Sequence, residues 1–235
     1  MQRTISAMVG KGSVNHNSRK FRAENVDGTR THLNIDYCNE NIKTVYHELF
    51  DEALERYNAK QTRSDRKIKD YYEKIRSSKQ EKPFHEIILQ VGGKGNMNAD
   101  TENGELAKQI LDEYYQGFQE RNPQLRVFSA HLHMDEATPH LHIDFVPFTT
   151  GSKRGLDTRV SLKQALATQG FKGGSRGDTE WSQWIQSEKE QLAAVMERYG
   201  IEWEQLGTHE KHLSVLDYKK QEREKELAAL GAKIE

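Results

Sequence analysis

The stretch that most constrains this chain is residues 131–147, HLHMDEATPHLHIDFVP, which holds four of its ten histidines. Side chains alternate between the two faces of a β-strand, so His131 and His133 share one face at the end of an apolar run. His140 and His142 share a face at the start of the next run. The connection between the runs is short, which predicts that the two strands pair antiparallel.

In such a pair His133, His140 and His142 converge. Three imidazoles at this spacing repel one another when protonated, and they are costly to bury without partners. A divalent metal resolves both problems, because neutral imidazole binds Zn, Mn, Fe, Co or Ni. A lone H-x-H is usually a half-exposed surface pair, but two facing units favour a metal. Three protein ligands leave open positions, as in catalytic sites, and the single Cys38 argues against structural zinc.

Length and composition allow one large domain, or a core of about 150 residues with an appendage. The chain has 235 residues, 34% hydrophobic and 30% charged, with a mean hydropathy of −0.92, which suggests long solvated helices. No apolar run approaches the ~20 residues of a membrane span, and no apolar stretch typical of a signal peptide begins the sequence. We therefore expect a cytoplasmic protein without membrane insertion.

The formal net charge of −1 conceals a segregation along the chain. Residues 1–85 carry a balance of +5 and residues 151–178 a balance of +4, whereas residues 86–150 carry −6 and residues 179–235 carry −4. Two basic segments flanking an acidic, histidine-rich centre suit a polyanion that lies across a metal. A near-neutral total predicts that contact with nucleic acid is confined to a track.

Periodicity predicts strands over 4–9, 83–93, 125–133 and 140–148, an extended piece over 31–37, and helices over 44–61, 64–79 and 101–121. Residues 10–20 are polar and contain glycine, which predicts a loop. Strands interleaved with helices, without a regular βαβ repeat, indicate an α+β fold. We expect a mainly antiparallel sheet with helices on one face and the histidines in a groove on the other.

After residue 149 the character of the sequence changes. Residues 151–178 form a basic, glycine-rich connector with a short helix over 161–168, and an amphipathic helix is predicted over 181–199. Residues 205–235 are charge-dense and helical in pattern. We predict a catalytic core over 1–150, a connector over 151–178 and a helical extension over 179–235. The unfinished charged helix at the end suggests a domain trimmed from a longer chain.

Three motifs in order carry a family resemblance. The central stretch resembles the H-x-D-E-x-x-P-H-x-H motif of the Mob/Pre plasmid mobilisation and recombination proteins, the MobV class of relaxases. Residues 16–19, HNSR, resemble that family's H-N-x-R motif, and residues 30–34, RTHLN, its R-x-H-x-N motif. The resemblance covers about residues 3–150, and residues 196–220 are similar less specifically.

The resemblance implies an HUH endonuclease fold and strand-specific nicking at a transfer origin. The family's metal ligands carry over to His133, His140 and His142, and its acidic position to Glu136. The nucleophile is a histidine in the first motif, here His16, with Arg19 near the scissile phosphate. Most other relaxases use tyrosine. This sequence has Ile35 where some relatives carry tyrosine, and Tyr37 lies two residues further on, as an alternative nucleophile.

The chemistry agrees with these assignments. Phosphodiester cleavage needs a Lewis acid, an in-line nucleophile and cations for the developing charge. His16 or Tyr37 supplies the nucleophile, and the fork of donors on Arg19 fits the charge. Asp135, or Glu136, can orient a ligand imidazole from behind, whereas Asn34 is expected to be structural or to hydrogen-bond behind the ligands. On local sequence alone His16 is an ordinary loop histidine and Arg19 a solvated or backbone-binding cation.

The expected partners are origin-of-transfer DNA, single-stranded or hairpin, and accessory transfer proteins, in the bacterial cytoplasm. The expected cofactor is a divalent metal ion, Mn or Mg in function, with other transition metals as alternatives. His131 and His32 are expected beside the site or in structural roles, and the three tryptophans in the core. Two alternatives stay open: an HUH nickase of rolling-circle replication or transposition, and a non-enzymatic DNA-binding regulator with a metal. The residues expected to contact DNA are Arg19, Lys20, Arg22, Lys153, Arg154 and Arg159.

Overall fold

The computed structural model describes residues 1–207, 220, 223, 224 and 227. The chain divides into two compact units, Met1–Gln205 and Leu206–Glu235, and the first carries all the elements discussed below. The helix predicted over 205–235 falls mostly on residues outside the described part. Within the described part, the structure has no helix that combines the length and the apolar character needed to cross a membrane.

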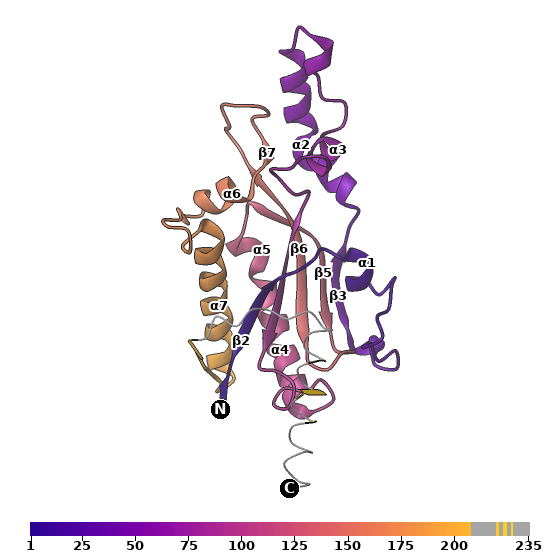
Figure 1. Ribbon diagram of the computed structural model, residues 1–235, viewed down its shortest axis with the longest axis vertical. Helices are drawn as coiled ribbons and strands as arrows, with labels where there is room; N and C mark the ends of the chain where they lie inside the picture. Colours follow the sequence, from indigo (N-terminus) through magenta and orange to yellow (C-terminus); the bar gives the residue numbers. More distant parts are fainter. Residues whose placement is uncertain (208–219, 221–222, 225–226, 228–235) are drawn as a thin grey trace. The chain divides into compact units, whose positions relative to one another are not determined.

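A six-stranded sheet organises the first unit (Figure 1). Five strands follow one another in the order β2-β4-β6-β5-β3, with every neighbouring pair antiparallel, and β7 pairs antiparallel with one end of β6. A separate two-stranded ribbon joins β1 to β8 in parallel. The strands are β1 (Gln2–Arg3), β2 (Ile5–Val9), β3 (Ile35–Asn39), β4 (His85–Val91), β5 (Leu125–His133), β6 (His140–Thr149), β7 (Arg159–Val160) and β8 (Glu202–Trp203).

Helices α2, α3, α4, α6 and α7 begin where a polar side chain accepts one of the first free backbone N–H groups. Asn41 caps α2, Thr101 caps α4, and Thr179 caps α7 in a reciprocal pair of hydrogen bonds with Ser182. The helices are α1 (Val14–Asn17), α2 (Ile42–Ala59), α3 (Tyr71–Arg76), α4 (Glu102–Gln116), α5 (Phe118–Arg121), α6 (Leu162–Thr168) and α7 (Glu180–Arg198), with 3₁₀ turns at Thr31–Leu33 and Ser64–Arg66.

The sheet has hydrophobic residues on both faces. One face packs against α4, α5, α6 and α7 in a large core, so residues of one parity, such as Leu141 and Ile143 of β6, are fully buried. Val146 has the parity of the histidines, and with Phe128 it joins α2 and α3 in a second cluster further along the sheet. The predicted antiparallel α+β fold is confirmed. Burial on both faces explains why β5 and β6 are almost wholly inaccessible to solvent.

Several local predictions differ from the structure. The predicted loop over 10–20 contains one helical turn, α1, which carries His16. The helix predicted over 64–79 is restricted to Tyr71–Arg76, because the Asn58 side chain bonds both the N–H and the carbonyl of Ile68 and so holds residues 60–69 as a loop. Residues 31–37 begin as a 3₁₀ turn before β3.

The connector and the helix predicted over 181–199 belong to the same sheet-based unit. β7 lies in the connector and pairs with β6, and α6 and α7 pack on the large core through Leu166, Trp184 and Leu192. Arg56 of α2 makes two hydrogen bonds to Asp157, which ties the connector hairpin to α2. The domain boundaries at 150 and 178, drawn from the change in sequence character after residue 149, stay a prediction.

Candidate metal centre and nucleophile

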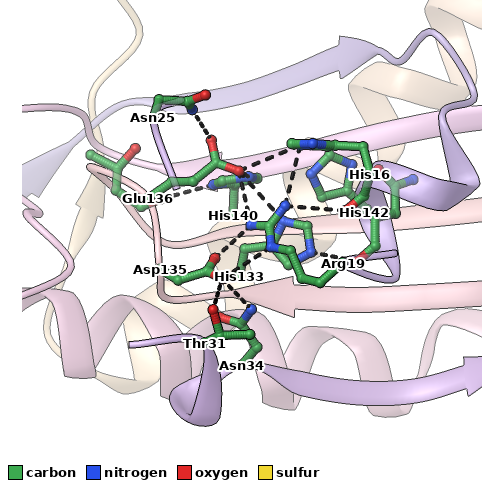
Figure 2. Close-up of polar contacts among 12 residues, drawn as sticks. His16, Arg19, Asn25, Thr31, Asn34, His133, Asp135, Glu136, His140 and His142 are labelled. Carbon is green, nitrogen blue, oxygen red and sulfur yellow. Dashed lines mark hydrogen bonds and ion pairs between the residues drawn. The ribbon is translucent and has the colours of Figure 1, made fainter. Parts of the chain in front are cut away.

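The β5–β6 hairpin brings the predicted histidines together (Figure 2). In its register His133 lies opposite His140 and His131 lies opposite His142, so all four rings project from one face. The ring centroid of His133 is 5.2 Å from that of His140 and 4.7 Å from that of His142. The centroids of His140 and His142 are 4.9 Å apart. The predicted convergence of three imidazoles is present in the structure.

Each of these three rings is held from behind by an oxygen. His133 donates from Nε2 to the carbonyl of Asn17 at 2.8 Å, and His140 donates from Nδ1 to the carbonyl of Thr138 at 2.8 Å. His142 contacts the Glu86 carboxylate through Nδ1 at 2.6 Å. A carbonyl or carboxylate oxygen only accepts, so the opposite nitrogen of each neutral ring carries a free lone pair. Those nitrogens are Nδ1 of His133 and Nε2 of both His140 and His142.

Burial keeps the imidazoles of His133 and His142 neutral. Burial and the neighbouring His142 and His140 rings lower the pKa of His133 well below its usual range. Burial lowers the pKa of His142 to about 4, although the Glu86 carboxylate opposes the shift. Nδ1 of His133 and Nε2 of His142 are buried and have no hydrogen-bond partner among the described residues. Orphaned buried nitrogens are rare in proteins, and a cation with nitrogen ligands would satisfy both.

The potential ligand atoms form two groups that share His133. His16, His133 and His142 offer nitrogens within 4.8 Å of one another, and so do His133, Glu136 and His140 with a carboxylate oxygen. His133, His140 and His142, the set predicted from sequence, thus fall across both groups. Imidazoles and one carboxylate are donors suited to a divalent transition metal. The residues present fit such an ion.

Glu136 lies at the centre of the nitrogens. Its Oε1 is 3.5 Å from His16 Nε2, 3.9 Å from His133 Nδ1 and 3.8 Å from His140 Nε2. The opposite oxygen accepts a hydrogen bond from the Asn25 side chain. Although burial opposes the shift, contacts with His16, His140 and Arg19 hold the pKa of Glu136 well below its usual range. Glu136 is therefore an anion within reach of either a metal or His16.

His16 differs from the other three histidines. Its ring centroid is 6.0 Å from that of His133 and 6.1 Å from that of His142, and its side chain is 22% exposed. Its Nε2 faces Glu136 and lies 3.3 Å from Nη1 of Arg19. No oxygen of the described residues holds its Nδ1. The one-turn helix α1 thus presents an imidazole to the site without fixing the ring from behind.

Arg19 is engaged by the two acidic residues of the hairpin turn and, through Nη1, by His16. Its guanidinium bonds both oxygens of Asp135, at 3.0 and 2.5 Å, and Glu136 at 2.9 Å. Although burial opposes it, these carboxylates raise the pKa of Arg19. Arg19 has φ +55°, a left-handed conformation that is uncommon for a residue with a side chain and clusters at functional sites.

Asp135 joins the R-x-H-x-N motif, residues 30–34, to the H-x-D-E-x-x-P-H-x-H motif in which it lies. Its Oδ2 accepts hydrogen bonds from Thr31 and from Asn34, and the Asn34 side chain in turn accepts from the N–H of Met134. Asp135 is fully buried, and despite that burial the bonds from Arg19 and Asn34 lower its pKa. Asn34 and Asp135 therefore hold the turn rather than touch the imidazole nitrogens.

Sequence reasoning missed a second layer of polar residues behind the histidines. The Asn17 side chain donates to Glu86 at 2.8 Å and to Asp144 at 3.0 Å, and Ser129 also donates to Asp144. Burial and the nearby Glu86 raise the pKa of Asp144 to about 7. One signal was available: Glu86 has the opposite parity to Ile87, Leu89 and Val91, and a charged residue inside an apolar strand calls for a partner.

Tyr37, the alternative nucleophile, lies away from the histidines. Tyr37 faces α4 on the opposite side of the sheet, where its hydroxyl donates to Asp112 at 2.7 Å and its ring lies 4.0 Å from that of Tyr115. Burial and Asp112 raise the pKa of the Tyr37 hydroxyl well above its usual range. His131 pairs with Asp36, and His32 contacts the carbonyl of Thr29.

The basic residues divide between two places. Lys20 and Arg22 are exposed in the loop that follows α1. Lys153 and Arg154 are exposed in the β6–β7 connection, and Arg159 bonds the Ser152 hydroxyl. β6 runs seven residues from His142 to Thr149, which is roughly 23 Å at the rise of an extended strand. The connector cations thus lie at the other end of the strand from the histidines.

Solved relaxase structures share the fold of this chain. A Mn-bound MobM relaxase domain (MOBV; Mob_Pre) in complex with plasmid oriT DNA superposes with a TM-score of 0.53 at 22% identity, over 93% of this chain and 99% of that one. A second structure of the same domain, with Mn and oriT DNA at another pH, gives 0.54 at 21% identity over 92% and 99%. At these identities the likeness concerns the fold.

The sequence comparisons give the family. The family described as plasmid recombination enzyme (Mob_Pre) matches residues 13–220, and this chain belongs to that family. A plasmid recombination enzyme type 2 of Staphylococcus aureus is 27% identical over 97% of the chain, and a plasmid recombination enzyme of a Bacillus species is 25% identical over 94%. The chain spans about half the length of these relatives, 46% and 45%. The Mob/Pre resemblance seen in the three motifs is confirmed.

Proposed function

We propose that this chain is the catalytic part of a metal-dependent relaxase that nicks one DNA strand at a plasmid transfer origin, holds the cut end covalently and later religates it. One observation carries the proposal. Three imidazoles, each fixed from behind by an oxygen, turn their opposite nitrogens toward a common space, and a fourth imidazole that is not fixed from behind lies beside them. Membership in the plasmid recombination family gives the substrate class.

We assign the metal to His133, His140 and His142, with Glu136 beside them. A divalent ion held there, such as the Mn of the related MobM domain, would act as a Lewis acid on a non-bridging oxygen of the scissile phosphate. Glu86 and the carbonyls of Asn17 and Thr138 keep the three rings in the tautomer that a metal requires. Magnesium is the second candidate ion, although three nitrogen ligands favour manganese.

We assign the nucleophile to His16. A neutral ring nitrogen attacks phosphorus, a P–N bond forms, and one bridging P–O bond breaks. The released oxygen takes a proton, and the imidazole loses its ring proton, so that charge balances. Reversal by the free hydroxyl end restores the strand. Glu136 lies 3.5 Å from His16 Nε2, and Arg19 is tethered by Asp135 within 3.3 Å of the same nitrogen.

DNA reaches this site along a basic track in our proposal. Lys20 and Arg22 lie in the loop after α1, whereas Lys153, Arg154 and Arg159 line the far connector, so a strand of several nucleotides would span both. Affinity should then fall steeply with salt, roughly in proportion to the phosphates contacted. Accessory transfer proteins would assist at the origin in the bacterial cytoplasm, where the plasmid resides.

The decisive experiment examines the covalent product. The chain is incubated with Mn and labelled single-stranded oligonucleotides that tile the element encoding it, and the adduct is mapped by mass spectrometry. His16→Ala should lose the adduct while keeping metal and DNA binding, and Tyr37→Phe should still form it. A phosphoramidate is labile in acid and stable in base. An acid-stable adduct, or one lost in Tyr37→Phe and kept in His16→Ala, would overturn the histidine assignment.

Two other functions predict different results. A rolling-circle or transposition nickase would give the same chemistry at a replication origin or at element ends, so the mapped nick position separates it from a relaxase. A DNA-binding regulator with a metal would bind DNA and metal and form no adduct. The unfixed ring of His16 and its 22% exposure favour an enzyme, because a structural site would enclose all four imidazoles.

A further inference from the structure

We infer that Phe21 is a stacking platform for a nucleobase of the single strand that enters the histidine site. This inference rests on the proposed function. Phe21 is 61% exposed, whereas the other large aromatic side chains of the first unit are buried or half-buried. A single exposed apolar residue is ordinary by itself. Its backbone anchoring and its charged neighbours set Phe21 apart.

The backbone of Phe21 is anchored beside the candidate nucleophile. Its N–H donates to the carbonyl of Asn15 at 2.9 Å, and Asn15 directly precedes His16 in α1. The chain reverses between them at Arg19, whose φ is +55° and whose side chain is fixed by Asp135 and Glu136. An exposed ring on so constrained a backbone loses little conformational entropy when a planar partner stacks on it.

The charges around Phe21 suit a nucleic-acid strand. Lys20 and Arg22 on either side are exposed, and neither forms an ion pair with a carboxylate of the described residues. Arg19, by contrast, is neutralised by two carboxylates. Arg22 also lies across Gly28, where a Cβ would come within 3.1 Å of its Nη1. An aromatic face between two unpaired cations combines base stacking with phosphate attraction, as single-stranded DNA binders do.

The test uses 2-aminopurine placed at successive positions of the tiled oligonucleotide, with binding measured in chelator so that no cleavage occurs. Stacking on an aromatic ring should quench the probe at one position near the mapped nick. Phe21→Leu, which keeps the bulk and loses the π-face, should remove that quench and weaken binding on the order of ten-fold, within the range of stacking energies. Phe21→Trp should retain both.

Two controls separate stacking from charge and from general surface effects. Val9→Ala alters another exposed apolar residue, 60% exposed, and should leave affinity unchanged. The double variant K20A/R22A should flatten the salt dependence of binding, whereas Phe21→Leu should leave that slope as it is.

The outcomes also separate this inference from the proposed function. If the wild-type chain forms the adduct while Phe21→Leu keeps the quench and the affinity, the stacking role is overturned and the relaxase stands. If the wild-type chain quenches the probe through Phe21 and yet forms no adduct with Mn, the stacking role is supported and the relaxase proposal fails.

Discussion

Two buried polar clusters lie on opposite faces of the same sheet, and they are satisfied to different degrees. On the α4–α7 side both carboxylate oxygens of Glu188 accept hydrogen bonds, from Tyr114, Arg121 and Asn122, and the Asn122 amide oxygen accepts from Trp184 at 2.7 Å. On the histidine side, Nδ1 of His133 and Nε2 of His142 have no partner in the described part of the chain.

The difference shows that one cluster stabilises the fold and the other is suited to bind a ligand. The cluster around Glu188, which we call the Glu188 cluster, joins α7 to α4 and α5 and uses its acceptors internally. In the histidine cluster one nitrogen of each ligand ring bonds an oxygen that orients the ring, and the other nitrogen is left for a ligand. Buried polar atoms without partners cost stability unless a ligand satisfies them, so their concentration in one place marks a binding site.

The largest expected effect tests the histidine nitrogens that are left for a metal. His133→Ala should reduce Mn affinity and nicking by roughly a thousand-fold or more, because His133 belongs to both groups of ligand atoms. Isothermal titration and a plasmid nicking gel measure the two losses. DNA affinity in chelator should be nearly unchanged, and His140→Ala and His142→Ala should behave alike. Metal-dependent nicking retained in all three variants would refute the assignment of the centre.

The second effect tests cohesion. Glu188→Ala leaves the buried Tyr114 hydroxyl without its acceptor and removes one acceptor each from Arg121 and Asn122. The free energy of unfolding should therefore fall by about 2–4 kcal/mol. Urea unfolding measures the loss. At temperatures where the variant is folded, its Mn affinity should equal that of the wild type. A loss of metal affinity without a loss of stability would erase the contrast between the two clusters.

The third effect tests the oxygen behind a ligand ring. Glu86→Gln retains the shape of the side chain and removes the charge that faces Nδ1 of His142, so metal affinity should fall about 10- to 100-fold. Calorimetry measures this change. Glu113→Gln, a matched variant whose carboxylate pairs with Arg198 at the surface, should bind metal normally. Equal affinities in both variants would show that Glu86 is not needed to orient His142.

The smallest expected effect concerns a histidine on the face of the sheet that packs against α4–α7. The ring of His85 stacks on Phe145 and lies 6.1 Å from Trp181, and burial lowers the pKa of His85 to about 4. The unfolded chain binds this proton near pH 6.5, so it takes up more protons than the folded chain between 6.5 and 4. Its contribution to stability is present above pH 6.5 and is lost as the pH falls, by about 1–2 kcal/mol at pH 5.

Urea unfolding at pH 7.5 and pH 5 should show that loss in the wild-type chain. The loss should be smaller in His85→Phe, which keeps an aromatic ring and cannot take up a proton. An identical pH dependence in both proteins would mean that His85 does not contribute to it.

The sequence predicted the parts of the site that lie within one hairpin or one turn. Alternation in two short strands was enough to place His133, His140 and His142 on one face, because strand parity is a local property. The partners behind them come from distant segments: Glu86 from β4 and Asn17 from α1. Their contacts depend on strand order, which local pattern does not specify.

Tyr37 illustrates the same limit from another direction. It is close in sequence to Asn34, which bonds Asp135 on the histidine side, yet it faces α4. The pairing of β3 with β5 shifts register between Asp36 and Cys38, so a count of residues from the second motif does not give its face. The start of the helix predicted over 64–79 was wrong for a comparable reason. The side chain of Asn58 bonds the backbone of Ile68 and holds it as a loop.

The oxygens that hold the three rings differ in how readily a substitution can remove them. His133 and His140 are oriented by main-chain carbonyls, those of Asn17 and Thr138, and every amino acid supplies a carbonyl. Only His142 depends on a side chain, that of Glu86. Random substitution can therefore disturb the tautomer of one ligand and leaves that of the other two almost untouched. A library screened for altered metal preference would find its variation at position 86 far more readily than at 138, provided the backbone path is kept.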